Sequence, residues 1–185
     1  MEGCAGMAEE RESLEAFVGR LLRECGRTIA CAESCTGGLL TSRLTDVAGS
    51  SAYVMGAIVS YTNEVKASLV GVHEATLKAF GAVSEETARE MAEGVRRAIP
   101  ADIGVGITGI AGPGGATTEK PVGLVYIAVA TAGAVRVERH IFDGVRTEVK
   151  RQSTEAALSM VRDLLLDDSR RITNISLRIL ENKGF

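Results

Sequence analysis

The sequence has few groups from which a metal centre or a histidine-based catalytic site could be built. It contains only two histidines, His73 and His140, and four cysteines confined to the first fifth of the chain. The cysteine spacing matches no zinc or redox motif, and neither histidine lies near these cysteines in the sequence. We therefore expect buried thiols in a reducing compartment, with no metal and no cofactor.

A membrane-spanning stretch and an excess of positive charge are also missing. No apolar run is long enough to cross a bilayer, and the acidic first ten residues lack the pattern of a signal peptide. The net charge of −3 and the pI near 5.5 argue against a dominant nucleic-acid footprint. We expect a cytoplasmic protein that binds neither membrane nor nucleic acid.

The sequence does contain a regular alternation of strand-like and helix-like segments. Apolar residues at helical spacing predict helices at about 14–25, 36–47, 84–98 and 146–166. Apolar segments predict strands at about 28–32, 53–61 and 102–108, followed by an antiparallel hairpin at 122–131 and 135–142. This order predicts an α/β fold, a three-layer α/β/α sandwich on a mixed, mostly parallel sheet with one antiparallel hairpin.

The 185 residues suit one domain with a sizeable core, which we expect to span residues 8–168. Residues 169–185 form either a tail or a further helix, with Ile172, Ile175 and Ile179 on one possible face. This segment could dock on the same domain or extend onto a partner subunit, and the sequence does not decide between the two.

The segment TIACAESCTGG, residues 28–38, predicts a strand that turns directly into a helix. Such a junction exposes a nucleophile, here Ser34, at the end of a strand and points a helix N-terminus toward bound anions. Thr36 can cap this helix, and Gly37 and Gly38 let a ligand approach the backbone closely. Capping alone also explains Thr36, so an ordinary strand–helix turn is the alternative.

Tyr61 and Lys66 follow the second predicted strand. If Asn63 opens a helix, Lys66 lies one turn beyond the strand end, and both side chains flank the sheet edge that carries Ser34. A neutral lysine accepts a serine proton where burial depresses its pKa, and Tyr61 could relay that proton or donate a hydrogen bond.

Two other nucleophilic arrangements compete with this serine–lysine pair. A Ser-His-Asp triad would need His73 or His140, which makes the pair the more economical reading. Cys35 is the competing nucleophile, with Glu33 as its base. We rank it behind Ser34 because no neighbour clearly lowers the pKa of its thiol.

The segment TGIAGPGGATTEKP, residues 108–121, predicts a long active-site loop. Its glycines leave backbone N–H groups open to an anion, and Lys120 adds a positive charge. A solvated connection is the alternative, but loops of this length in compact domains are more often functional. Residues 104–109, GVGITG, have the letters of a dinucleotide fingerprint, yet its glycines begin inside a strand and no helix follows.

Together these motifs resemble the CinA C-terminal domain family. AESCTGG, GSS, YTNEVK, GAVSEE, TGIAGPGG with EKPVG, and GVR occur in that order over about residues 14–166. Enzymatic members are nicotinamide-nucleotide amidohydrolases, so the resemblance implies metal-free hydrolysis of nicotinamide mononucleotide to nicotinate mononucleotide and ammonia, in pyridine nucleotide salvage. It also implies a homodimer. Many CinA proteins carry an amino-terminal domain that is missing here, so the sequence looks like the stand-alone deamidase form.

The motif matches also assign expected roles to residues. The family's nucleophilic serine falls on Ser34, and its tyrosine and lysine fall on Tyr61 and Lys66, so we expect these three to be catalytic. The loop threonine falls on Thr108, and the arginine after the hairpin falls on Arg146. The full expected substrate-binding set is Glu33, Cys35, Thr36, Gly37, Gly38, Thr108, Gly109, Gly112, Gly114, Gly115, Lys120 and Arg146.

The sequence departs from the family pattern at two places. The loop reads GPGGATTEK where the family often has GPDGG followed by acidic residues, and Lys150 stands where an arginine is common. These departures bear on substrate fine-tuning rather than on the type of reaction.

Two other functions are alternatives to amide hydrolysis. A non-catalytic binding module linked to competence and recombination would have no reason to keep Ser34, Tyr61 and Lys66 together at strand ends. A phosphatase or pyrophosphatase would be expected to show a carboxylate-rich metal site, and the sequence shows none.

Overall fold

The computed structural model describes residues 12–182, and it describes side chains as far as Arg170 with the exception of Ser169. The elements in chain order are α1 (Leu14–Glu24), β1 (Ile29–Glu33), α2 (Leu39–Thr45), the 3-10 helix η1 (Ser50–Ala52), β2 (Val54–Val59), α3 (Asn63–Val70), α4 (Glu74–Phe80), α5 (Glu85–Ala98), β3 (Ile103–Gly109), β4 (Leu124–Ala130), β5 (Val135–Ile141) and α6 (Arg146–Asn182). The acidic start of the chain and the predicted domain boundary at residue 8 lie outside the described residues.

The five strands form one sheet in the order β2-β1-β3-β4-β5. β1 lies at its parallel centre, between β2 and β3. β4 runs antiparallel to both β3 and β5, so four of the five strands point the same way. The predicted mixed, mostly parallel sheet with a terminal hairpin is therefore confirmed. The antiparallel β3–β4 pairing is an addition, which arises because the chain returns through a loop instead of a crossover helix.

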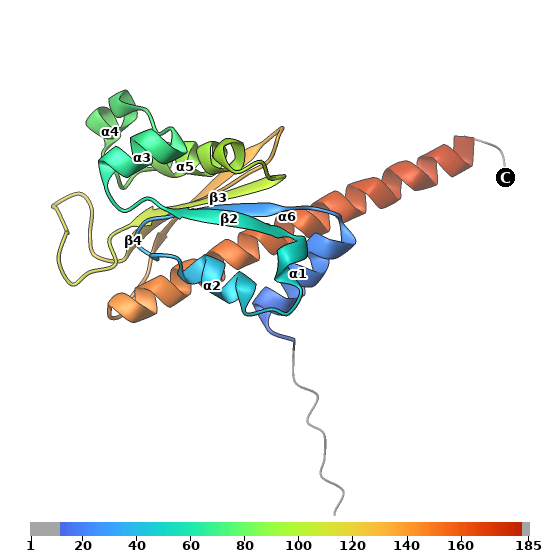
Figure 1. Cartoon of the computed structure of the whole chain (residues 1–185), viewed down its shortest axis with the longest axis horizontal. Coiled ribbons are helices and arrows are strands. Elements are labelled where there is room, and N and C mark those ends of the chain that lie inside the picture. The colour runs from blue at the N-terminus through green and yellow to red at the C-terminus, as the bar shows by residue number, and fades with distance from the viewer. Residues whose placement is uncertain (1–11, 183–185) are drawn as a thin grey trace, which may run out of the picture.

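Helices cover both faces of this sheet, which confirms the three layers (Figure 1). Successive residues of β1 point to opposite faces. Ile29 and Cys31 pack in the core under α1, α2 and α6, whereas Ala30 and Ala32 pack in the core under α3 and α5. All five residues of β1 are buried as a result, and the strand fixes the position of whatever follows it.

The glycines of the GVGITG segment let α5 lie directly on β3. A Cβ atom added to Gly104 would overlap the carbonyl oxygen of Ala92, and one added to Gly106 would overlap that of Ala88. Only glycine allows such a close helix–strand approach. These glycines therefore serve packing, in line with the rejection of a dinucleotide fingerprint.

Two helix boundaries differ from the prediction. α2 begins at Leu39 instead of Thr36, because Gly37 and Gly38 adopt left-handed backbone angles. α6 does not end near Leu166 but continues to Asn182, and its last part extends beyond the sheet (Figure 1). The predicted face of Ile172, Ile175 and Ile179 lies outside the described side chains. No helix within residues 12–182 has the length and apolarity to span a membrane.

Candidate active site

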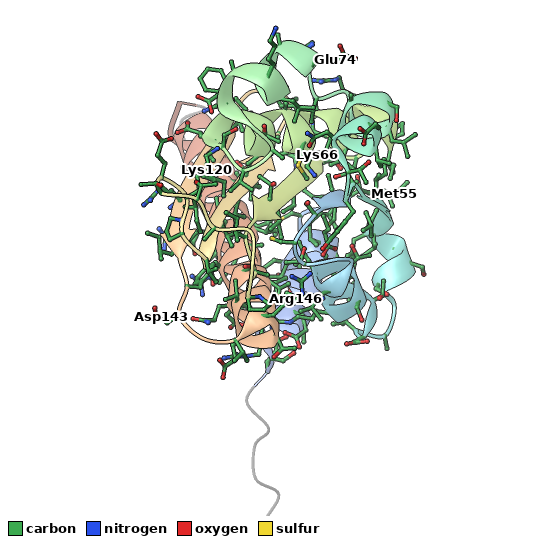
Figure 2. All side chains as sticks on the ribbon, turned by 90° about the vertical axis from the view of Figure 1, so that its left-hand side faces the viewer. Met55, Lys66, Glu74, Lys120, Asp143 and Arg146 are labelled. Carbon is green, nitrogen blue, oxygen red and sulfur yellow. The ribbon has the colours of Figure 1, made fainter. Side chains whose placement is uncertain are left out.

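A cavity of about 260 Å³ opens at the carboxyl edge of the parallel strands. Ser34 directly follows β1, Thr108 is near the end of β3, and Tyr61 lies just beyond β2. Figure 2 looks onto this end of the molecule, with Lys66 above Arg146. The lining consists of Ser34, Cys35, Tyr61, Lys66, Ala82, Val83, Thr108, Gly109, Ile110, Ala111, Gly112, Gly114, Gly115 and Arg146.

Lys66 and Ser34 are in direct contact within this cavity. The Nζ of Lys66 donates hydrogen bonds to Ser34 Oγ at 3.0 Å and to the carbonyl oxygen of Ser60 at 2.7 Å. The position of Lys66 follows from α3, which begins at Asn63 and is capped by the hydroxyl of Thr62, which accepts from Val65 N–H at 3.4 Å. The lysine therefore reaches the serine from the first turn of the helix that follows the neighbouring strand β2.

The surroundings of Lys66 favour its neutral form. The side chain is 1% exposed, and this burial lowers the pKa of its amino group. The opposing electrostatic influence on this pKa comes from Cys35 and not from a carboxylate. A neutral amine beside a serine hydroxyl is the arrangement that general-base activation of a nucleophile requires.

Burial also favours the neutral form of the neighbouring Cys35 thiol. Cys35 is 6% exposed, and burial raises the pKa of its thiol to about 11, against the opposing effects of a backbone hydrogen bond and of the Arg146 guanidinium. The thiol is therefore protonated at neutral pH and is a poor nucleophile. The ranking of Ser34 ahead of Cys35 is consistent with this environment.

Glu33 is not placed as a base for the thiol, because its carboxylate caps α2. It accepts hydrogen bonds from the backbone N–H groups of Gly38, Leu40 and Thr41 and from the Thr41 hydroxyl. The predicted cap by Thr36 is wrong: Gly38 occupies the N-cap position. Within the described part of the chain, the buried hydroxyl of Thr36 has no hydrogen-bond partner. The N-terminus of α2 is thus already occupied by an internal anion.

Arg146, the first residue of α6, joins three parts of the cavity wall. Its guanidinium donates to the carbonyl oxygen of Gly112 at 2.8 Å and to the hydroxyl of Tyr61 at 3.1 Å. The Tyr61 hydroxyl therefore bonds to Arg146 and not to Ser34 or Lys66, so the structure shows no direct proton relay through it. Arg146 places a positive charge beside the glycine loop.

Lys120 belongs to the same loop but does not line the cavity. In Figure 2 it lies to the left of Lys66. Its Nζ donates to the carbonyl oxygen of Phe80 at the end of α4, at 2.6 Å. Thr108 makes a parallel connection, because its hydroxyl donates to the carbonyl oxygen of Ala82 at 2.6 Å. Both bonds attach the segment between α4 and α5 to the active-site loop.

The structure brings together ten of the fifteen predicted site residues and leaves Glu33, Thr36, Gly37, Gly38 and Lys120 outside the lining. The sequence reasoning missed Ala82, Val83, Ile110 and Ala111. Ile110 and Ala111 belong to the predicted loop, so its motif could have indicated them. Ala82 and Val83 carry no chemical signal and reach the site only through tertiary packing.

No candidate metal centre occurs in the described residues. Between residues 12 and 170, no three or more histidine, cysteine, aspartate or glutamate side chains cluster so as to hold a metal ion. Cys31 and Cys35 are buried free thiols.

Fold and cavity together define an α/β domain with a buried serine–lysine pair at the ends of parallel strands. A family model, the CinA C-terminal domain, matches residues 11–165. The chain belongs to this family.

Known relatives and solved structures agree with this assignment. A putative competence-damage inducible protein of Moorella thermoacetica is 51% identical over 150 residues, which cover 81% of this chain and 36% of that protein. A CinA-like protein of a Sulfurihydrogenibium species is 48% identical over 162 residues, covering 88% and 40%. The chain thus spans about two fifths of the length of these curated relatives.

The fold is also that of solved CinA superfamily proteins. The competence/damage inducible protein CihA from Agrobacterium tumefaciens superimposes with a TM-score of 0.78 at 41% identity, over 85% of this chain and 99% of that one. A CinA superfamily protein from Klebsiella pneumoniae gives a TM-score of 0.81 at 32% identity, over 83% and 96%.

Proposed function

We propose that this protein hydrolyses the amide of nicotinamide mononucleotide to give nicotinate mononucleotide and ammonia, with Ser34 as nucleophile and Lys66 as its base. The observation that carries the proposal is the contact between Lys66 Nζ and Ser34 Oγ at 3.0 Å inside a buried site. The substrate comes from the resemblance to nicotinamide-nucleotide amidohydrolases, since the cavity itself carries no mark of a nicotinamide ring.

The first half of the reaction forms an ester. Neutral Lys66 accepts the proton of Ser34 while Oγ bonds to the amide carbon, and the carbonyl oxygen becomes an oxyanion. The backbone N–H groups of Cys35 and Thr36 donate to the backbone of no other described residue, and we assign them to hold that charge. The C–N bond then breaks, and the Lys66 ammonium gives its proton to the departing nitrogen, which leaves as ammonia.

The second half returns the enzyme to its starting state. Lys66, neutral again, takes a proton from a water molecule whose oxygen attacks the ester carbon. The bond to Ser34 Oγ breaks, and the serine oxygen recovers its proton from Lys66. The product acid ionises at neutral pH, and no electron transfer or co-reactant other than water is needed.

The substrate phosphate is expected to lie near Arg146 and the glycine loop. The backbone N–H groups of Gly112, Gly114 and Gly115 donate to the backbone of no other described residue, and the Arg146 guanidinium lies beside them. The capped N-terminus of α2 offers no competing anion site. Binding energy from the phosphate would position the amide at Ser34.

The alternative of a non-catalytic binding module has no comparable support in the geometry. The names of the relatives refer to competence and damage, but they describe those proteins. A buried lysine beside a serine costs stability and has a direct use in catalysis. The expectations of a homodimer and of no nucleic-acid partner stay predictions.

The test is product analysis with purified full-length protein. Nicotinamide mononucleotide should yield ammonia and nicotinate mononucleotide in equal amounts, at the same rate with and without a metal chelator. Lys66→Ala should lose about a thousandfold in kcat while its circular dichroism spectrum stays that of the folded protein. An inactive wild-type protein, or a Lys66→Ala variant with near-normal turnover, would refute the proposal.

A further inference from the structure

Glu33 is a fully buried acid that the proposed mechanism does not use. Its backbone belongs to β1, between β2 and β3, where its carbonyl oxygen accepts from Ser60 N–H at 2.8 Å. Its side chain contacts the helical layer that covers the sheet, because the carboxylate lies against the first turn of α2. One residue therefore ties the end of β1 to the start of the helix.

The carboxylate of Glu33 is fully satisfied. One oxygen accepts from Gly38 N–H at 3.0 Å and Leu40 N–H at 3.1 Å. The other accepts from Thr41 N–H at 2.9 Å and from the Thr41 hydroxyl at 2.7 Å. Four donors on two oxygens match the acceptor capacity of a carboxylate.

These bonds enclose the turn that carries the nucleophile. Ser34 directly follows Glu33, its N–H donates to Ile107 on β3 at 2.9 Å, and its carbonyl oxygen accepts from Gly37 N–H at 3.1 Å. Gly37 and Gly38 both have positive φ, so this turn depends on glycine geometry and on its two ends being held. The Glu33 side chain holds the far end.

We propose that Glu33 is a positioning residue, whose carboxylate holds the turn of residues 34–38 so that Ser34 Oγ stays within hydrogen-bond distance of Lys66 Nζ. The inference rests on the proposed roles of Ser34 and Lys66. The Glu33 carboxylate bonds to Gly38, Leu40 and Thr41 and not to Ser34 Oγ or Lys66 Nζ, so it acts through the backbone. Misplacement of a reacting group by about 1 Å costs on the order of a hundredfold in rate.

The charge of Glu33 has a second consequence at Cys35. Its negative charge is one of the influences that raise the pKa of the Cys35 thiol, after burial. The same carboxylate that holds Ser34 therefore helps to keep its neighbour protonated. Removing the charge should lower the thiol pKa, a change that the loss of a structural hydrogen bond elsewhere would not produce.

Glu33→Gln is the informative variant. Glutamine has one acceptor oxygen and one NH2 group. The NH2 group would face backbone N–H groups that donate to the carboxylate in the wild type, and two donors cannot bond to each other. Arg146 and the glycine loop keep their contacts in this variant. We expect kcat for nicotinamide mononucleotide to fall by about a hundredfold with KM nearly unchanged, and Cys35 to be alkylated faster at a given pH.

Asp102→Asn is a matched control at the opposite end of β1. The Asp102 carboxylate likewise accepts from a backbone N–H and a hydroxyl, both of Thr28 and both at 2.9 Å. The Asp102→Asn variant should have a lower melting temperature, with kcat and the pH profile of Cys35 alkylation unchanged. Thr41→Val covers the case in which Glu33→Gln fails to fold. It removes the shortest of the four bonds and should lower kcat by about fivefold at constant KM.

A second substrate separates this inference from the proposed function. Hydrolysis of a small activated ester, p-nitrophenyl acetate, corrected for the rate of Ser34→Ala, reports the reactivity of Ser34 without nicotinamide mononucleotide. If the wild type does not act on the nucleotide, a Glu33-dependent ester reaction would still support the inference. Folded Glu33→Gln with kcat and ester reactivity within about threefold of wild type would overturn it. So would an equal loss in Asp102→Asn, or a folded Thr41→Val with unchanged kcat.

Discussion

The amino group of Lys66 and the hydroxyl of Ser34 lie 3.0 Å apart although 32 positions separate the two residues in the sequence. Each residue follows a strand, and these strands, β1 and β2, are parallel neighbours. Parallel strands end at the same edge of a sheet, so the fold itself brings the base to the nucleophile. Burial by the surrounding helices then favours the neutral amine.

The lowered pKa of Lys66 predicts the pH dependence of the reaction. The base acts only when neutral, so kcat/KM should rise about tenfold per pH unit below its pKa and level off above it. Because burial lowers that pKa, the plateau should begin below the ordinary lysine range. The measurement is kcat/KM from pH 6 to about pH 11. An activity that still climbs throughout the ordinary lysine range would contradict a depressed pKa.

Arg146 should matter through the substrate phosphate. Arg146→Ala should raise KM for nicotinamide mononucleotide by at least about tenfold, because a charge-assisted contact is lost from the cavity wall. Nicotinamide riboside, which lacks the phosphate, should be a poor substrate of the wild type and lose less on this substitution. Lys120→Ala is the matched control, since Lys120 lies outside the lining and should leave the preference for the mononucleotide intact. Equal catalytic efficiency on both substrates would argue against an anion site here.

The thiol of Cys35 should be inert at neutral pH. With a pKa of about 11, its alkylation by iodoacetamide should be slow at pH 7 and rise about tenfold for each pH unit toward that value. Peptide mapping by mass spectrometry distinguishes Cys35 from Cys25, which is partly exposed. Rapid labelling of Cys35 at pH 7, together with loss of activity, would show instead that the thiolate is present and in use.

Gly104→Ala should destabilise the fold, because the added Cβ would overlap the carbonyl oxygen of Ala92 in α5. Overpacking of this kind costs about 1–3 kcal/mol in the free energy of unfolding. Gly133→Ala provides the comparison, since nothing lies within 4 Å of a Cβ at that turn. Urea denaturation of both variants checks the expectation. If Gly104→Ala is as stable as Gly133→Ala, then α5 does not lie against β3 as described.

The order of strands and helices could be predicted because their apolar periodicity is clear, and the same reasoning placed Ser34, Tyr61 and Lys66 at strand ends. The predicted end of the helix at 146–166 was wrong, because the apolar residues that indicate a buried helix face stop near Leu166. The helix nevertheless continues, as no glycine or proline interrupts the chain between Gly144 and Gly184.

The directions in which the Glu33 and Lys120 side chains point could not be predicted from the sequence. Glu33 was expected near the substrate, yet its carboxylate caps α2, since three unpaired N–H groups lie within its reach. Lys120 was expected at the cavity, but the carbonyl oxygen of Phe80 at the end of α4 accepts its hydrogen bond. Both outcomes depend on which backbone groups tertiary packing brings close, and no motif in the chain records that.

The central claim is that Ser34, and not Cys35, attacks the amide. Single-turnover release of ammonia from nicotinamide mononucleotide, measured in Ser34→Ala and Cys35→Ala, tests it most directly. Ser34→Ala should lose on the order of a thousandfold or more while still binding the substrate, and Cys35→Ala should keep most of the wild-type rate. An active Ser34→Ala beside an inactive, folded Cys35→Ala would contradict the account and assign the nucleophile to the thiol.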